Sequence, residues 1–144
     1  NACTAMQNKS ANFAFGPLII QYQKIKLPNG MYLRYPDLRT EGRETVYGSG
    51  RHKTKIYGGK LCENITQALA RIVVTDQMLA ADEYLNTVGG RIVLQVHDEL
   101  VGIAPQTDPE QTINKMYDIM RTPPAWAPTL PLDAEGGYAD NYSK

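Results

Sequence analysis

The sequence has little of several features that define whole classes of protein. Its 144 residues include two cysteines, Cys3 and Cys62, and neither belongs to a CxxC or Cys/His array. A disulfide framework and a zinc site are therefore not indicated, and reduced thiols are expected. Apolar runs are far shorter than the roughly 18 residues that a membrane-spanning helix needs. The formal net charge is zero, so the whole chain exerts no long-range attraction on nucleic acid or on an anionic membrane.

What the chain does contain is typical of one folded, soluble domain. Hydrophobic residues make up 42% and charged residues 21% of the sequence, and the mean hydropathy is -0.39. These values allow a buried core and exclude a disordered chain. Because the first residue is Asn1 and not methionine, we expect a processed, split or excised piece, or one trimmed for expression.

Although acidic and basic residues are equal in number, they are distributed unevenly along the chain. Residues 39–60 hold six basic and two acidic residues, whereas from Asp98 onward eight acidic residues face three basic ones. The basic, glycine-bearing segment Tyr47–Lys55 is typical of a mobile loop that can approach phosphates, although a solvated surface loop has the same composition. The basic residues of this segment are Arg51, Lys53 and Lys55, and the next lysine along the chain is Lys60.

Periodicity and turn signals predict an α+β fold with an antiparallel sheet. Asn-Gly at positions 29 and 30 indicates a tight turn between two strands, and a polar tripeptide separates two strand-like runs later in the chain. Asp108 or Thr107 is expected to cap the last helix. The predicted elements are a helical tail over 1–16, a hairpin over 18–38, a short strand over 54–57, a long helix over about 60–86, a hairpin over 91–104, a helix over about 108–121 and a short strand near 130–132.

One face of the long predicted helix is polar. Asn64, Gln67 and Arg71 recur at helical spacing, away from the apolar stripe that begins with Ile65 and Leu69. We interpret these three side chains as a candidate DNA-binding stripe, and a plain solvated helix face has the same pattern.

The apex of the hairpin over 91–104 is the best chemical candidate. Its three polar residues are His97, Asp98 and Glu99, placed where a two-stranded ribbon reverses. Adjacent carboxylates repel each other, and a divalent cation such as Mg²⁺ converts that repulsion into binding. A polar turn between buried strands explains the same residues without any chemistry.

The order of several motifs resembles the C-terminal palm region of family A DNA polymerases, particularly the bacteriophage-type members. The motifs are VHDEL at 96–100, the helix start YGGKLCENITQALAR at 57–71, LPNGMYLRYP at 27–36, and TPPAWAPTLPL at 122–132 followed by Ala134, Glu135 and Gly136. The resemblance covers about 16–144, so it implies that 17–144 is the C-terminal part of a polymerase palm and that 1–16 is the tail of a preceding segment.

The resemblance assigns roles to individual residues. Asp98 matches the motif C carboxylate that binds two catalytic Mg²⁺ ions, Glu99 its acidic neighbour, and His97 the residue beside the primer terminus. Gln67 matches a helix glutamine that contacts the minor groove, where acceptors are nearly independent of sequence. The family has an amide four residues before that glutamine, and this chain has Glu63 there.

Two parts of the family's active site have no good match in this chain. The second metal-binding aspartate belongs to an Asp-Tyr-Ser motif, of which residues 140–143 are only a superficial echo, and residues 9–16 only faintly resemble the nucleotide-binding helix. The resemblance therefore implies that a second chain or segment supplies fingers, thumb and motif A. The implied ligands are primer–template DNA, a deoxynucleoside triphosphate and two Mg²⁺ ions.

Two other functions fit the same residues. One is a non-catalytic DNA-binding module or accessory subunit that uses the basic segment over 39–60 and the stripe at 64, 67 and 71. The other is a different metal-dependent phosphotransferase or nuclease built on Asp98 and Glu99. In each case we expect a cytoplasmic protein, in a bacterial host if it is viral, without a membrane partner. Apolar docking patches are expected at residues 18–20 and around Trp126, and a local core explains the same residues.

Overall fold

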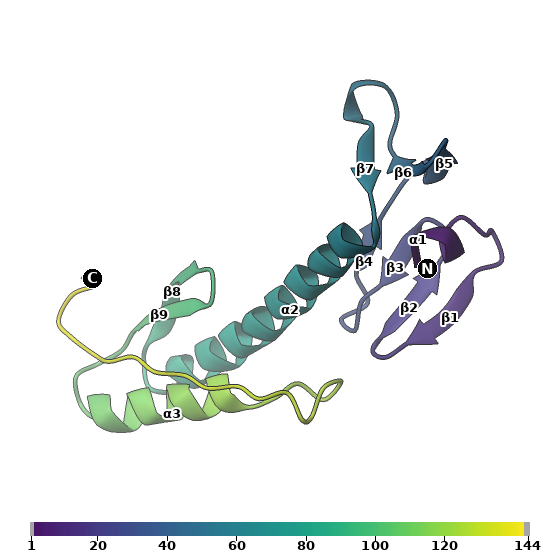
Figure 1. Cartoon of the computed structure of the whole chain (residues 1–144). Helices are drawn as coiled ribbons and strands as arrows, with labels where there is room; N and C mark the ends of the chain where they lie inside the picture. Colours follow the sequence, from purple (N-terminus) through teal and green to yellow (C-terminus); the bar gives the residue numbers. More distant parts are fainter. Residues whose placement is uncertain (1, 143–144) are drawn as a thin grey trace. The chain divides into compact units, whose positions relative to one another are not determined.

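The protein folds into two compact units, and the structure, a computed structural model, describes residues 2–142 (Figure 1). The first unit comprises residues 1–71 and the second residues 72–144. Helix α2 spans Gly58–Thr87, so its first half belongs to the first unit and its second half to the other. Each unit has its own core, and we describe each by itself.

The first unit begins with an antiparallel four-stranded sheet in the order β1-β2-β3-β4. Leu18, Ile20 and Ile25 are buried on one face of this sheet, next to Cys3 and Met6 of the preceding segment. Alternation of buried and partly exposed residues along β2 is the pattern of a sheet with one covered face. The elements are α1 (Ala2–Ala5), β1 (Asn12–Phe15), β2 (Leu18–Gln21), β3 (Lys24–Lys26) and β4 (Tyr32–Arg34).

The turn predicted at Asn29 and Gly30 is confirmed. Gly30 has φ +85°, and its N–H donates to the Leu27 carbonyl oxygen at 2.9 Å. This turn joins β3 to β4, with Lys26 opposite Tyr32. Because glycine lacks a Cβ, it adopts this backbone conformation at little cost. The predicted turn thus joins an antiparallel pair, but the segment over 18–38 forms three strands and not the expected two, because β2 pairs with β3 and β1 pairs with β2.

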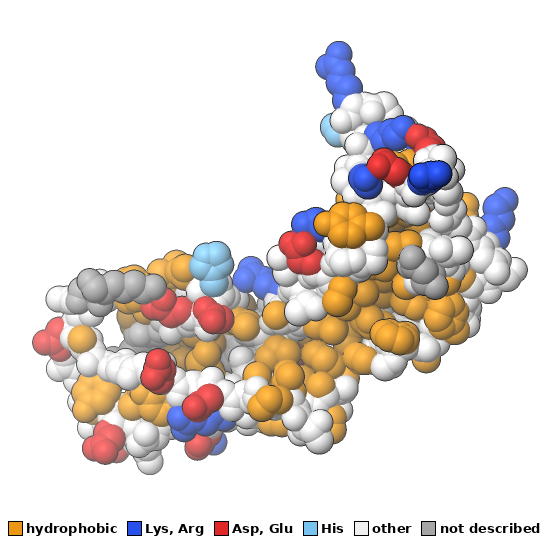
Figure 2. Space-filling model, in the orientation of Figure 1, with side chains coloured by type: hydrophobic (Ala, Val, Ile, Leu, Met, Phe, Trp, Pro, Cys, Tyr) orange, Lys and Arg blue, Asp and Glu red, His pale blue; other side chains and the backbone are white. Residues whose placement is uncertain are grey.

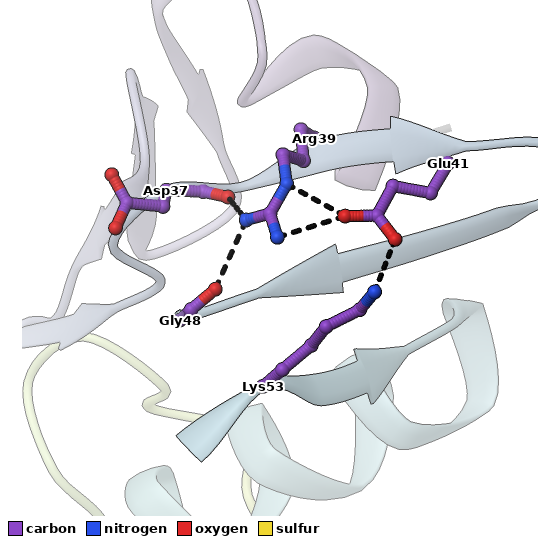
Figure 3. A network of polar contacts seen from close by, with 5 residues as sticks. All are labelled: Asp37, Arg39, Glu41, Gly48 and Lys53. Carbon is purple, nitrogen blue, oxygen red and sulfur yellow. Dashed lines mark hydrogen bonds and ion pairs between the residues drawn. The ribbon is translucent and has the colours of Figure 1, made fainter. Parts of the chain in front are cut away.

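A second antiparallel sheet follows, built from β5 (Arg39–Glu41), β6 (Glu44–Tyr47) and β7 (Thr54–Ile56). Arg39 ties its strands together. Its guanidinium donates to the carbonyl oxygens of Asp37 and Gly48 at 2.9 and 3.0 Å and pairs with Glu41 at 2.8 Å (Figure 3). We expected a mobile loop over Tyr47–Lys55, but the ends of this segment lie in β6 and β7. Residues 48–53 form a short connection with one 3-10 turn, Gly50–His52.

The second unit consists of a two-stranded sheet and two helices. Strands β8 (Arg91–Val96) and β9 (Glu99–Ile103) pair antiparallel, and α3 spans Pro109–Arg121. Ala81, Leu85 and Met116 form its core, against which Ile92 and Leu100 of the hairpin pack. The Asp108 carboxylate accepts a hydrogen bond from the Gln111 N–H at 2.9 Å, which confirms Asp108 as the N-cap.

The α+β class, the long helix and the helix after Asp108 are confirmed, and three expectations about the sheets and the termini are wrong. Residues 12–15 form a strand, so the helical tail expected over 1–16 is reduced to α1. The hairpins over 18–38 and 91–104 belong to separate sheets. Within residues 2–142, no strand forms near 130–132. Pro128 and Pro131 lack the N–H that a ladder needs, and the segment lies along α3 instead, where Arg121 binds Asp133 at 2.8 Å (Figure 1).

The docking patch expected at residues 18–20 is wrong, because Leu18 and Ile20 are 3% and 2% exposed and belong to the buried core. Trp126 is partly buried, and a docking role for the region around it stays a prediction. Large exposed apolar side chains occur elsewhere, notably Phe15 in β1 and Ile103 in β9.

Candidate functional site

The apex of the β8–β9 hairpin is a two-residue turn made of His97 and Asp98. Val96 and Glu99 are paired directly across it, so the loop is as short as a hairpin allows. Both loop residues are exposed, and Glu99, the first residue of β9, is partly buried. Within residues 2–142, the Asp98 carboxylate has no hydrogen bond or ion pair. The strands therefore hold an available carboxylate in solvent at a defined position.

His97 adopts a backbone conformation that usually belongs to glycine. Its φ is +53°, and the two-residue turns that join β1 to β2 and β5 to β6 have Gly16 at +56° and Gly42 at +62° in the same first position. A side chain in this region costs about 1 kcal/mol or more relative to glycine. Such strain is retained where the rest of the fold imposes it, and it is concentrated at functional sites.

The two faces of the hairpin differ. Leu100 packs against the core formed by α2 and α3, so its neighbours Glu99 and Val101 point to the opposite face. A β-bulge between Ile92 and Leu94 interrupts the ladder in β8. Bulges increase local twist and redirect side chains, and they are common beside active sites. Leu94 and Ile103 are 42% and 50% exposed, so the hairpin also offers apolar surface.

The donor set of this apex suits a hard divalent cation only in part. Asp98 and Glu99 are carboxylates, the ligand type that Mg²⁺ prefers, and Mg²⁺ retains water and substrate oxygens in its remaining positions. In the described part of the chain, no group of three or more His, Cys, Asp or Glu side chains is placed to hold a metal ion. Any magnesium site at this apex therefore needs ligands beyond those that residues 2–142 bring together.

The polar stripe on α2 is formed, and its members differ in how available they are. Gln67 and Arg71 are exposed, and the Gln67 side-chain amide donates to the Glu63 carboxylate at 3.4 Å. Asn64 is partly buried, and its amide donates to the Tyr35 hydroxyl at 3.2 Å. Gln67 and Arg71 thus present polar groups to solvent, whereas part of the Asn64 amide is used within the fold.

The basic residues over 39–60 are also unequal. Lys53 pairs with Glu41 (Figure 3). Lys55 pairs with Glu44, and Lys60 pairs with Glu63 at 3.0 Å. All three pairs are solvent-exposed, so each one contributes little to stability and opens easily. Arg51 is exposed and has no ion pair within residues 2–142. Arg51, together with Arg43, which is likewise exposed and has no ion pair among residues 2–142, is therefore more available to a phosphate than the paired lysines of this segment.

The charge gradient coincides with the division into units. Residues 1–71 contain eleven basic and four acidic side chains, a formal charge of +7, and residues 72–144 carry the opposite charge of -7. Since three of the four acids in the first unit, Glu41, Glu44 and Glu63, already pair with bases, its remaining cations are largely uncompensated.

One group of cations, of which Arg34 is exposed and the two lysines are partly exposed, was not predicted from the sequence. Lys24, Lys26 and Arg34 lie in β3 and β4, outside the basic segment on which we focused. The signal was present, because LysIleLys and TyrLeuArg alternate polar and apolar residues on the two sides of the Asn-Gly turn. Alternation places the polar members of both strands on one face.

Comparison with known proteins gives one informative match. A DNA polymerase of Bacillus phage SP02 is 34% identical to this chain over 131 residues. The match covers 83% of this chain and 19% of the relative, so the chain spans about a fifth of that polymerase's length. No protein-family model matches the chain. No solved structure matches it either.

This similarity agrees with the coarser part of the sequence prediction, a relation to a phage DNA polymerase. It does not reach the individual residues, so the roles of His97, Asp98, Glu99 and Gln67 stay predictions. Among residues 2–142, no helix has the length and apolar character that crossing a membrane requires.

Proposed function

We propose that this chain is part of a DNA-directed DNA polymerase of family A and contributes one wall of its nucleotidyl-transfer site. The carrying observation is the hairpin apex, where a rigid two-residue turn exposes Asp98 between His97 and Glu99. The similarity to a phage DNA polymerase over most of the chain supports the same conclusion. In this proposal the hairpin over 91–104 is motif C of a palm domain.

Asp98 and Glu99 act as anchors and not as nucleophiles. Two bound Mg²⁺ ions would supply the chemistry of the site, by favouring ionisation of the primer 3′-hydroxyl and by neutralising charge on the departing pyrophosphate. Asp98 would be the principal ligand from this chain, with Glu99 as an auxiliary ligand. The remaining carboxylate anchor, fingers, thumb and nucleotide-binding helix come from another chain or segment.

The remaining predicted residues position DNA. His97, held at the apex by the strands on either side, would contact the primer end. The exposed Gln67 amide is suited to minor-groove acceptors, which differ little between correct base pairs. Arg71, Arg51 and the lysines at 53, 55 and 60 would contact phosphates, which provides affinity without sequence preference.

The decisive experiment is a chimera in which this chain replaces the matched segment of the SP02 phage polymerase. Primer extension by the chimera is compared with that of its Asp98→Asn variant, which keeps the size of the side chain and removes its charge. We expect extension to fall at least about a thousandfold, while affinity for primer–template DNA stays within about twofold. Asp118→Asn, at an exposed position of α3, is the matched control and should extend normally.

A second candidate function is a DNA-binding module without catalysis, which the charge of +7 on residues 1–71 favours. Under that function the Asp98→Asn chimera retains full extension, and Arg51→Ala lowers DNA affinity instead. Retained extension by the Asp98 variant, in a chimera that is active, would refute the catalytic proposal. Mg²⁺-dependent cleavage of DNA by the isolated chain would favour the third alternative, a nuclease.

A further inference from the structure

The outer face of the four-stranded sheet in the first unit carries four side chains that we call the cationic face: Lys24, Lys26, Tyr32 and Arg34. Ile25 is fully buried on the opposite face, so Lys24 and Lys26 point away from the core. The register places Lys24 opposite Arg34 and Lys26 opposite Tyr32. Residues paired directly across two strands lie on the same face.

These cations gather around an aromatic ring. The Lys24 ammonium lies 4.7 Å and the Arg34 guanidinium carbon 5.2 Å from the centre of the Tyr32 ring. Contacts of this kind hold long, flexible basic side chains over the sheet at modest energetic gain. Within residues 2–142, no acidic side chain pairs with Lys24, Lys26 or Arg34. Their charge is therefore available to an external anion.

A pocket of about 310 Å³ adjoins the cationic face. It is lined by Tyr22, Gln23, Lys24, Arg34 and Pro36. Tyr22 is exposed, and the Gln23 amide donates to its hydroxyl at 3.0 Å, which restrains the ring. Asp37 is the acidic residue nearest in sequence to the residues that line the pocket. It contacts the pocket through its backbone, because the Asp37 N–H donates to Gln23 Oε1 at 3.2 Å. An aromatic wall, a proline ring, an amide and two cations thus surround one recess.

We propose that this pocket and the cationic face bind single-stranded DNA. A base can stack on Tyr22 while Lys24 and Arg34 contact the phosphates on either side of its nucleotide, and Lys26 continues the basic track along β3. Aromatic stacking combined with a basic groove is the usual means of binding single strands without sequence preference. In a duplex the bases stack on one another, so no base face is open to stack on Tyr22.

Within the proposed polymerase, the ligand is the unpaired template strand. That assignment rests on the proposed function, whereas binding of a single-stranded oligonucleotide does not. The site is also independent of Asp98, which belongs to the other unit.

Fluorescence anisotropy with a labelled oligo-dT and with a blunt hairpin duplex of equal length tests the proposal on the full chain. The double variant Lys24→Ala/Arg34→Ala should bind the single strand about tenfold more weakly. The slope of log affinity against log salt should become less steep by about 1.4, as expected for two lost phosphate contacts. Duplex binding should change less than twofold.

The aromatic part of the site has its own variant. Tyr22→Leu should weaken single-strand binding about fivefold or more, as expected for a lost base-stacking contact, and leave the salt slope unchanged. Lys115→Ala and Tyr138→Leu are the matched controls, because both side chains are exposed and lie outside the pocket. Thermal unfolding of each variant shows whether the fold is kept.

Several results would overturn the proposal. Unchanged single-strand affinity in both site variants would do so, and so would equal losses in Lys115→Ala and the double variant. An equal loss for duplex and single strand would show a non-specific basic surface. If single-strand binding is unaffected while Asp98→Asn abolishes extension by the chimera, this proposal fails and the proposed function stands. If the site variants weaken single-strand binding while Asp98→Asn leaves extension by the chimera unchanged, the proposed function is refuted and the single-strand site stands.

Discussion

His97 and Gly42 occupy the same position of two equivalent hairpin turns, with φ of +53° and +62°. In the turn between β5 and β6, glycine adopts this conformation at no steric cost. At the apex between β8 and β9, the chain accepts the strain of a histidine beside the exposed Asp98. The comparison indicates that the identity of residue 97 is set by something other than the stability of the turn.

The first prediction concerns substitutions at these two turn positions, His97 and Gly42. His97→Gly should leave the free energy of unfolding unchanged or raise it by up to about 1 kcal/mol, because the strain of a side chain at positive φ is removed. Gly42→Ala should lower it by about 1 kcal/mol, since a Cβ at Gly42 meets no atom within 4 Å and only the backbone is strained. Urea unfolding followed by circular dichroism measures both values. A clear loss of stability in His97→Gly would contradict the interpretation.

The second prediction concerns the hydrogen bond that joins Asn64 of α2 to the hydroxyl of Tyr35. Tyr35 is 3% exposed, and its ring contacts Tyr47 edge-on at 5.2 Å. Asn64→Ala should lower the free energy of unfolding by about 1 kcal/mol because this contact is lost. Asn114→Ala, an equal change at an exposed position of α3, should be neutral within about 0.5 kcal/mol. Equal effects of the two substitutions would show that the Tyr35 contact adds nothing.

The third prediction is a pH dependence that arises from the same tyrosine. Burial raises the pKa of Tyr35 above its ordinary value, although the hydrogen bond from Asn64 acts in the opposite direction. The folded state therefore holds this proton more tightly than the unfolded chain does. The resulting stability is complete at pH values below the ordinary tyrosine pKa of about 10 and is lost as the pH rises beyond it. Urea unfolding between pH 8 and pH 11 should show a smaller decline for Tyr35→Phe than for the unsubstituted chain.

The fourth prediction tests how the hairpin is seated on its core. A Cβ added at Gly102 would lie 2.5 Å from Leu85 Cδ1, a distance that forces the buried leucine or the strand to move. Gly102→Ala should cost about 1 to 3 kcal/mol of stability. Gly137→Ala is the control, because a Cβ there meets nothing within 4 Å and its φ is not positive. In the chimera, Gly102→Ala should also reduce extension if the position of the apex matters for catalysis.

The fifth prediction separates available from paired cations in the basic segment. Arg51→Ala should weaken duplex DNA binding and reduce the salt slope by about 0.9, the effect of one phosphate contact. Glu41→Gln removes the acid that pairs with Lys53, and it should increase DNA affinity by freeing that lysine. Anisotropy titrations at several salt concentrations measure both effects. If Glu41→Gln weakens binding, the Arg39 network that contains Glu41 has an organising role in this surface (Figure 3).

Much of the fold followed from local signals in the chain. The long apolar repeat predicted α2 to within two residues at its start and one at its end, since a helix of this length is specified by its own periodicity. The sequence also predicted the turn at Asn29–Gly30, the helix cap at Asp108 and the chain reversal at 97–98, because turns and caps depend on a few adjacent residues. The apex carboxylates were found for the same reason.

What a sequence cannot state is how separate elements pair. Long-range hydrogen bonding decides that β1 joins the first sheet and that the two hairpins lie in different sheets. Residues 130–132 follow α3 and add no strand, because proline lacks an N–H donor. Residue types alone also did not show that Glu41 and Glu63 neutralise Lys53 and Lys60, or that Lys24 and Arg34 converge on Tyr32.

The sequence by itself therefore determined the two longer helices, the turns at 29–30 and 97–98, the exposed acidic apex and the similarity to a phage polymerase, because each of these resides in a run of neighbouring residues. The tertiary structure decided which charged side chains remain available to a ligand and on which face of a sheet they lie together. Pairing depends on distances between side chains that lie far apart along the chain, and these distances exist only once the strands have found their partners.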